Sequence, residues 1–307
     1  MKTKVFIAGQ EGMVGSAIYD LLKKKKYNLI DCKRSKLDLT SQRSVESFFK
    51  KYRPNIVINA AGRVGGILDN SKFQSDYLYI NSMIGLNLTN CSFKYKVKKM
   101  INLGSACIYP KYSKNPIKEK HLLTSELEPS NEGYALAKIL TLKYSSYLNK
   151  KFSKDFISLQ PANLYGEKDN FDLHSSHVIP ALIRKFHEAK IKNKKKVIVW
   201  GDGTPKREFL HVKDLADAIY FCLKKKINHT YLNVAGIDHV SINQLSKVIK
   251  KVTKFEGKIV FDESYPNGVK NRKLDNAILT KLGWKAKINL KKGLQSYYKY
   301  FVDMERS

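Results

Sequence analysis

The 307-residue chain has few of the features that mark disulfide-bonded, metal-bound or membrane-spanning proteins. Its four cysteines are widely separated and none forms a C-x-x-C pair, which argues against a disulfide framework and a metal site. No apolar run approaches the ~18 residues that suggest a membrane span. The first strand-like segment starts so close to Met1 that no room is left for a signal peptide. We therefore expect a cytoplasmic globular protein without a bound metal ion.

Acidic residues are scarce, with 27 Asp and Glu against 57 Lys and Arg, and the formal net charge is +30. Such an excess raises the possibility of nucleic-acid binding. However, the basic residues occur in short runs such as Lys23–Lys26 and Lys224–Lys226, where helices are expected to end and cations complement the helix dipole. No zinc spacing or RNA-binding signature accompanies them. We interpret the excess as a general lysine bias that would also attract anionic nucleotides, with a basic RNA-binding protein as the non-enzymatic alternative.

The N-terminal segment combines a strand, a glycine-rich turn and a helix. Lys4–Ala8 has the composition of a buried strand, and a helix pattern runs from Ser16 to Leu22. Glycines between them allow a tight turn and close approach of a pyrophosphate, which then lies at the positive end of the helix. The residues expected to contact a dinucleotide here are Gly9, Gly12, Met13, Val14 and Gly15.

A tyrosine and a lysine lie four residues apart in the middle of the chain. Tyr134 and Lys138 would share one face of a helix, where the ammonium would lower the pKa of the phenol and favour proton donation near neutral pH. Upstream, Ser105 ends an apolar run and would hold a substrate carbonyl beside the phenol. Taken alone, this spacing is better explained by a surface Tyr/Lys pair, because it is common by chance, but the glycine turn favours an oxidoreductase site.

Strand-like and helix-like segments alternate through the first half, which favours an α/β fold with a doubly wound parallel sheet. The expected strands are 4–8, 27–30, 56–59, 99–103 and 156–159, and the expected helices are 13–22, 42–51, 76–93 and 134–149. Beyond Pro161 the pattern loosens, with helices expected near 178–189, 212–223 and 242–252. Asp38 and the pair Ala60–Ala61 follow strands, on the edge where such sheets bind ligands. Asp38 would meet adenine and the alanines the ribose and phosphates, although both could be ordinary turns.

Together these features resemble the extended short-chain dehydrogenase/reductase family, which implies a Rossmann-like sheet with a smaller, mostly C-terminal α/β substrate domain. Longer motifs narrow the resemblance to the GDP-L-fucose synthases, which are 3,5-epimerase/4-reductases of GDP-4-keto-6-deoxy-D-mannose in nucleotide-sugar biosynthesis. The resemblance runs from about Lys4 to Trp284. The motifs that carry it are 104–110 (GSACIYP), 127–134 (LEPSNEGY), 163–166 (NLYG), 176–182 (SHVIPAL) and 199–212 (VWGDGTPKREFLHV). Dehydratases of the wider family carry an Asp-Glu pair where this chain has Ala106 and Cys107, so elimination of water is not expected.

The resemblance implies five catalytic residues. Cys107 would remove protons from C3 and C5, which the C4 ketone acidifies, and His177 would deliver protons to the opposite face. Ser105 and Tyr134 would hydrogen-bond O4, Tyr134 would donate a proton while NADPH gives hydride to C4, and Lys138 would also touch the nicotinamide ribose. Alone, a cysteine is more often a small buried hydrophobe and a histidine a solvated residue.

The same resemblance implies the binding residues. The further cofactor contacts are Lys33, Arg34, Asp38, Ala60, Ala61, Tyr134, Lys138, Pro161, Asn163, Leu164 and His177. Arg184, Trp200 and Arg207 would grip the nucleotide and diphosphate of the substrate, with Arg272 as a further candidate. Each could otherwise be a surface or packing residue.

The cofactor side departs from the family pattern. Glu11 and Cys32 stand where the family usually places arginines near the 2′-phosphate of NADP. Asp31 lies near the position at which NAD-specific relatives bind the ribose 2′-hydroxyl. Lys33 and Arg34 still offer positive charge, so NADP is the expected cofactor and NAD the alternative.

The substrate side departs as well. Gly133 replaces the proline that is usual before the tyrosine, and residues 270–274 fit the family pattern poorly. An alternative function is therefore C4 reduction, with or without epimerisation, of another GDP-4-keto sugar such as a 6-deoxy-heptose or a dideoxy sugar for surface polysaccharide.

The resemblance also implies a domain division and an assembly. We expect residues 1–163, joined by part of about 197–230, to bind NADP, and residues 164–196 and 231–307 to bind the GDP-sugar. The helices at 76–93 and 134–149 resemble those that pair across a two-fold axis in the family, so a homodimer is expected.

Overall fold

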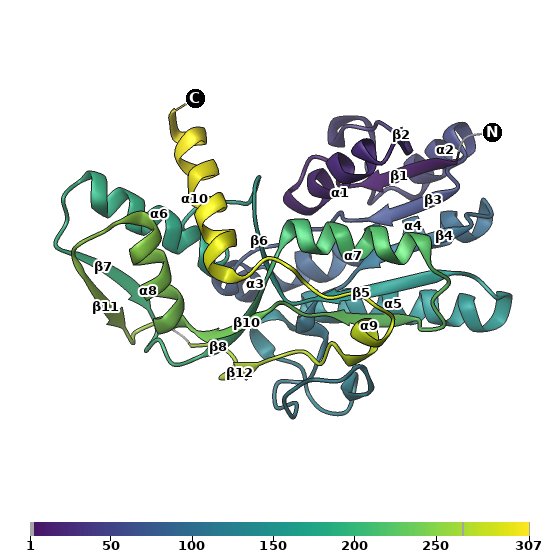
Figure 1. Ribbon diagram of the computed structural model, residues 1–307. Helices are drawn as coiled ribbons and strands as arrows, with labels where there is room; N and C mark the ends of the chain where they lie inside the picture. The colour runs from purple at the N-terminus through teal and green to yellow at the C-terminus, as the bar shows by residue number, and fades with distance from the viewer. Residues whose placement is uncertain (1–2, 266, 307) are drawn as a thin grey trace.

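The computed structural model describes residues 3–265 and 267–306, which form a large α/β part and a smaller part (Figure 1). The large part is built on a parallel six-stranded sheet in the order β2-β1-β3-β4-β5-β9. Its strands are β1 (Lys4–Ala8), β2 (Asn28–Ile30), β3 (Ile56–Asn59), β4 (Lys99–Leu103), β5 (Phe156–Pro161) and β9 (Tyr231–Val234). The doubly wound parallel sheet expected from the sequence is confirmed.

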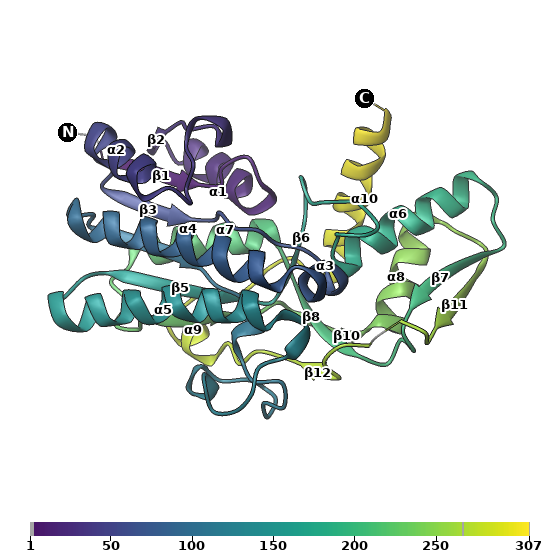
Figure 2. The ribbon, with the colours of Figure 1, turned by 180° about the vertical axis from the view of Figure 1, so that it is seen from behind.

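The central strands are apolar along their length because helices cover both faces of the sheet. Alternate residues of a strand point to opposite faces, so in β1 Val5 and Ile7 enter one core while Phe6 and Ala8 enter another. Helices α1 (Met13–Lys24) and α7 (Val212–Lys224) pack into the first core, and α2 (Gln42–Tyr52) and α4 (Gln74–Lys94) pack into the second. The long helix α5 (Glu132–Phe152) runs alongside α4 (Figure 2).

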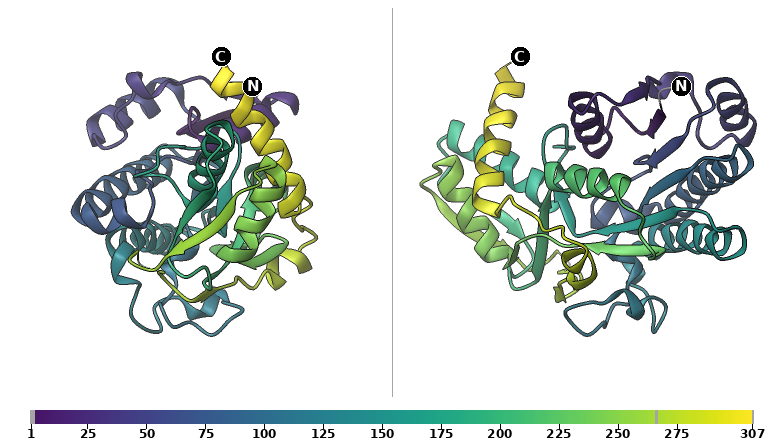
Figure 3. Two further views of the ribbon diagram at one scale, coloured as in Figure 1. Left: turned by 90° about the vertical axis from the view of Figure 1, so that its left-hand side faces the viewer. Right: turned by 45° about the vertical axis from the view of Figure 1, so that its right-hand side comes forward.

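The smaller part has two short sheets and its own core. One sheet has the order β10-β8-β12, with β6 also paired to β8, and the other pairs β7 with β11. Helices α6, α8 and α10 pack around these strands (Figure 3). Its elements are β6 (Asn163–Tyr165), α6 (Val178–Ile191), β7 (Lys196–Trp200), β8 (Lys206–His211), β10 (Asp238–Ser241), α8 (Ile242–Thr253), β11 (Lys258–Asp262), β12 (Asn271–Arg272) and α10 (Leu290–Arg306).

The chain crosses between the two parts several times. Strand β9 lies at the edge of the large sheet because it pairs with β5, from Ser158 with Tyr231 to Pro161 with Val234. The sequence placed residues from 231 onward in the smaller part, so β9 lies on the other side of the expected boundary. Helix α9 (Ala277–Lys281) also contacts β9, whereas β7 pairs with β11 in the smaller part. The assignment of NADP and GDP-sugar to separate domains stays a prediction.

Within residues 3–265 and 267–306, no helix combines the length and apolar character that crossing a membrane requires. The same residues contain no group of three or more His, Cys, Asp or Glu side chains placed to hold a metal ion. The cytoplasmic location expected from the sequence stays a prediction.

Candidate active site

The glycine turn joins β1 to α1. Gly9 has a φ of +82°, and a Cβ there would lie 2.8 Å from the Ala60 carbonyl oxygen. A Cβ on Gly15 would lie 1.9 Å from the Gly9 carbonyl oxygen. Gly12 caps α1, and a Cβ on it would meet only that oxygen, at 3.5 Å. The turn is thus closed on the protein side and open beside the first-turn N–H groups of α1, which is the shape that a phosphate requires.

The acidic residues of the cofactor side have partners within the chain. Gln10 donates a side-chain hydrogen bond to Asp31, and the backbone N–H of Arg34 donates to Glu11 at 2.7 Å. The Lys33 and Arg34 side chains are exposed. The two carboxylates are therefore engaged locally, and positive charge remains available beyond β2.

The other expected cofactor residues differ in their contacts. Asp38 accepts hydrogen bonds from the hydroxyl and backbone N–H of Thr40, which lower its pKa, so it stabilises a turn. Residues 161–164 span the end of β5 and the start of β6. The Asn163 side chain donates to the Glu208 carbonyl at 3.1 Å. Ala60 and Ala61 follow β3 and pack on Gly9.

Ser105, Cys107 and Tyr134 lie together between β4 and α5. Ser105 caps the short turn η2 (Ala106–Ile108), and its hydroxyl accepts a hydrogen bond from the Cys107 backbone N–H at 3.1 Å. Burial raises the pKa of Tyr134, nearby Cys107 and Tyr77 raise it further, and a hydrogen bond with Ser105 opposes them. Hydroxyl, thiol and phenol therefore face one region, as the sequence predicts.

Lys138 lies one helical turn beyond Tyr134. Its ammonium is 5.6 Å from the centroid of the Tyr134 ring and donates to the Leu103 carbonyl at 2.9 Å. Burial lowers the pKa of Lys138 to about 8. The expected lowering of the Tyr134 pKa is wrong for this arrangement, because burial of the phenol dominates.

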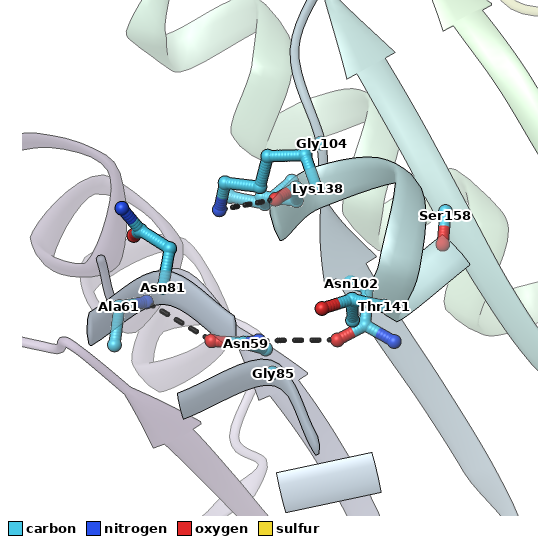
Figure 4. Close-up of a pocket in the computed structure, with 10 residues that line it drawn as sticks. Asn59, Ala61, Asn81, Gly85, Asn102, Gly104, Lys138, Thr141 and Ser158 are labelled. Carbon is cyan, nitrogen blue, oxygen red and sulfur yellow. Dashed lines mark hydrogen bonds between the residues drawn. The ribbon is translucent and has the colours of Figure 1, made fainter. Parts of the chain in front are cut away.

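A small polar cavity lies behind the Lys138 side chain (Figure 4). Asn59 donates to Asn102 at 3.1 Å, and Asn102 donates to Ser145 at 3.1 Å. This buried network links the ends of β3 and β4 to α5, the helix that carries Lys138. No sequence motif indicates this network, because its members come from three separate elements.

Gly133 has a structural reason to replace the usual proline. Its N–H donates to the Gln74 side chain at 2.9 Å, and a Cβ on it would lie 2.5 Å from the Gln74 carbonyl oxygen. A proline could not donate this bond. The backbone where α5 begins is therefore held by its contact with the start of α4, and not by a proline ring.

His177 and Cys107 lie on different elements. His177 caps the N-terminus of α6, and burial lowers its pKa. The segment before it meets the loop after β3, where the Gly66 N–H donates to the Ser175 carbonyl at 2.8 Å. The Cys107 sulfur accepts a hydrogen bond from the Asn131 side chain at 3.4 Å.

The expected nucleotide-binding residues only partly converge. The Trp200 ring stacks on Tyr265, with centroids 4.4 Å apart and an interplanar angle of 5°, and the Lys185 ammonium lies 4.5 Å from the Trp200 ring. Arg184 instead pairs with Glu188 at 2.7 Å. Neither Lys185 nor Tyr265 was expected from the sequence. Arg184 and Lys185 are adjacent in the chain, and only the orientation of α6 decides which of the two faces Trp200.

Two arginines lie side by side near the Cys107 turn. Arg207 of β8 and Arg272 of β12 are register partners. Burial lowers the pKa of Arg207 to about 10, Arg272 lowers it further, and Cys107 and Glu128 oppose this. Arg272 is buried and bonds to the backbone of the turn.

Comparison with known proteins agrees with this geometry. Residues 5–235 match the model of the NAD dependent epimerase/dehydratase family. A GDP-L-fucose synthase of Sinorhizobium fredii is 45% identical over 97% of this chain and 95% of its own length, and that of Escherichia coli is 42% identical over 98% and 97%. The solved GDP-mannoheptose C4 reductase of Campylobacter jejuni with NADP bound is 34% identical, with a TM-score of 0.91 over 98% of both chains. The chain therefore belongs to the NAD dependent epimerase/dehydratase family, with GDP-L-fucose synthases among its relatives.

Proposed function

We propose that the chain converts GDP-4-keto-6-deoxy-D-mannose to GDP-L-fucose, as a 3,5-epimerase and an NADPH-dependent 4-reductase. The observation that carries the proposal is the meeting of Ser105, Cys107 and Tyr134 at one place between β4 and α5. A reductase needs the hydroxyl and the phenol, whereas only epimerisation needs a thiol beside them. The full-length similarity to GDP-L-fucose synthases supports the same substrate.

The residues of the large part fit a bound NADP. Its pyrophosphate would rest on the open side of Gly12, against the N–H groups of Met13 and Val14, and its 2′-phosphate near Lys33 and Arg34. When bound, NADPH supplies the hydride for C4. The NADP-bound heptose reductase supports this cofactor for a chain of the same fold.

The chain's own residues would carry the protons. Cys107, as the thiolate, takes a proton from C3 or C5, and His177, as the protonated imidazolium, returns one to the other face from the start of α6. Ser105 and Tyr134 stabilise charge on O4 by hydrogen bonds. Tyr134 then gives its proton to O4, and the Lys138 ammonium near its ring stabilises the phenolate that forms.

The Trp200 site would hold the GDP end. Lys185 and Trp200 provide positive charge and an aromatic face, and Lys185 replaces Arg184 as the cation beside the ring. Arg207, beside Arg272, would supply a further cation for the diphosphate. Arg184 stays a candidate for the rim of this site.

Reduction of a GDP-heptose is the second candidate function. The similarity to the Campylobacter jejuni reductase favours it, because that fold match also covers nearly the whole chain. A C4 reductase without epimerase activity would not exchange protons at C3 and C5.

Solvent exchange tests the proposal. In heavy water with GDP-4-keto-6-deoxy-mannose, the wild-type protein should incorporate deuterium at C3 and C5. Cys107→Ser should lose this exchange, because an alcohol ionises far less readily than a thiol of pKa ~8.5. Cys32→Ser is the matched control, since Cys32 is also a partly exposed free thiol. Wild-type exchange in Cys107→Ser would overturn the assignment of the base.

We also propose a homodimer formed through α4 and α5. Apolar side chains remain exposed along both helices, among them Leu78 (39% exposed), Tyr79 (64%), Leu140 (43%) and Tyr147 (65%). A second copy of the same helices would cover them around a two-fold axis. Light scattering at micromolar concentration should give twice the mass of the 35.2 kDa chain, and a monomer would refute the proposal.

A further inference from the structure

Arg272 joins the C-terminal third of the chain to the turn that carries Cys107. It lies on β12 with only 9% of its surface exposed. Its guanidinium donates to the Ala106 carbonyl at 2.5 Å and to the Tyr109 carbonyl at 3.4 Å. These partners are more than 160 positions away in the sequence, so the contact is a tertiary one.

The two carbonyls flank Cys107. Ala106 precedes the cysteine directly, and Tyr109 follows the last residue of η2. The Arg272 guanidinium therefore donates to the backbone on both sides of Cys107. Arginine suits this task because its donors are fixed in a fork, whereas a lysine ammonium is a point charge. The same turn also presents the Cys107 N–H to Ser105.

Arg272 is itself held firmly. Its strand pairs with β8, where Arg207 is the register partner. Directly after it in the chain, the Ile117 N–H donates to the Lys273 carbonyl at 2.7 Å, and the Leu274 N–H donates to the Glu208 side chain at 3.2 Å. A group anchored in this way can fix the turn.

We propose that Arg272 is a positioning residue that sets the place of the Cys107 thiol, in contrast to the substrate-binding role expected from the sequence. The inference deepens the proposed function, because a base at Cys107 matters only if the sugar is epimerised. Since both guanidinium bonds go to protein backbone, the side chain has a complete role without any substrate contact.

Two variants and a matched control test the inference. Arg272→Met removes the fork, Arg272→Lys keeps the charge, and Lys270→Met removes an exposed charge two residues away. The first readout needs no substrate: amide hydrogen exchange of the peptide 104–110. We expect faster exchange in Arg272→Met, a smaller increase in Arg272→Lys and none in Lys270→Met.

The second readout is deuterium incorporation at C3 and C5, measured beside hydride transfer to C4. Misplacing the thiol should slow incorporation ~10- to 100-fold in Arg272→Met. Hydride transfer should fall less, and NADPH affinity and the melting temperature should show that the variant is folded. Partial recovery of incorporation is expected in Arg272→Lys.

Unchanged amide exchange in Arg272→Met would overturn the inference, and so would normal incorporation with a raised KM for the sugar. If the wild-type protein incorporates no deuterium, the proposed epimerisation fails instead. The amide-exchange result would then still decide whether Arg272 orders the turn.

Discussion

The two parts of the molecule build their sites in different ways. In the large part, the glycine turn and the Tyr134–Lys138 pair each come from one short segment, whose shape follows from neighbouring residues. In the smaller part and at its border, the contacts at the expected substrate residues include ones that join distant segments, such as Trp200 with Tyr265 and Arg272 with Ala106. The cofactor side is therefore encoded locally, and the substrate side depends on tertiary packing.

Substitutions in the two parts should therefore have different kinds of effect. A change on the cofactor side should act through the local turn or helix that carries it. A change on the substrate side should act through contacts between distant segments, such as strand pairing and buried charge.

The largest effect should come from the phenol. Tyr134→Phe removes the proton donor to O4, and general acid catalysis contributes ~10²–10⁴-fold, so NADPH-dependent turnover should fall by that factor while cofactor still binds. Tyr112→Phe, at a tyrosine that is 80% exposed and lies outside α4 and α5, is the control. Stopped-flow NADPH oxidation gives the rate, and a Phe variant with wild-type turnover would remove Tyr134 from the mechanism.

The next effect concerns a buried carboxyl of the smaller part. Burial raises the pKa of Glu208 to about 7, whereas an unfolded glutamate titrates near ~4.3. Between these values the native state keeps a proton that the unfolded chain releases, so this contribution to stability is present at low pH and is lost as pH rises towards 7. The loss should be of the order of 3 kcal/mol.

Urea unfolding between about pH 4.5 and about pH 7.5 checks this sign. Glu208→Gln should flatten the dependence, while the exposed control Glu256→Gln should not. An equally steep decline in Glu208→Gln would mean that another group is responsible.

A smaller effect distinguishes two glycines of the same turn. Gly15→Ala forces a Cβ against the Gly9 carbonyl oxygen and should destabilise the fold by about 1–3 kcal/mol. Gly12→Ala has space in the protein, so it should cost less stability but weaken NADPH binding, because the cofactor approaches on that side. Chemical unfolding and NADPH titration of both variants separate these costs, and equal losses in both assays would contradict local encoding.

The smallest effect tests which residue of α6 meets the nucleotide. Lys185→Met should weaken GDP binding about threefold to tenfold, as expected for loss of a cation at the Trp200 ring. Arg184→Met should change it less than about twofold, because its partner Glu188 lies on the same helix. Calorimetric titration with GDP measures both, and the reverse order would restore the residue chosen from sequence.

The same contrast explains what could be predicted from the sequence. Lys4–Ala8 and the glycines after it define a strand and a turn through local rules, so the fold and the cofactor turn were expected correctly. Asp31 and Gln10 show a limit, because their pairing depends on how β2 approaches the turn. Tyr265, Lys185 and the contacts of Arg272 could not be found, because no local pattern states which distant segments pair.

One measurement tests the central claim most directly. The purified chain is incubated with GDP-4-keto-6-deoxy-D-mannose and NADPH, and the product is identified by NMR. The account predicts GDP-L-fucose, with inverted configuration at C3 and C5 and a hydroxyl at C4. A C4-reduced sugar that retains the original configuration at C3 and C5, or no consumption of NADPH, would contradict it.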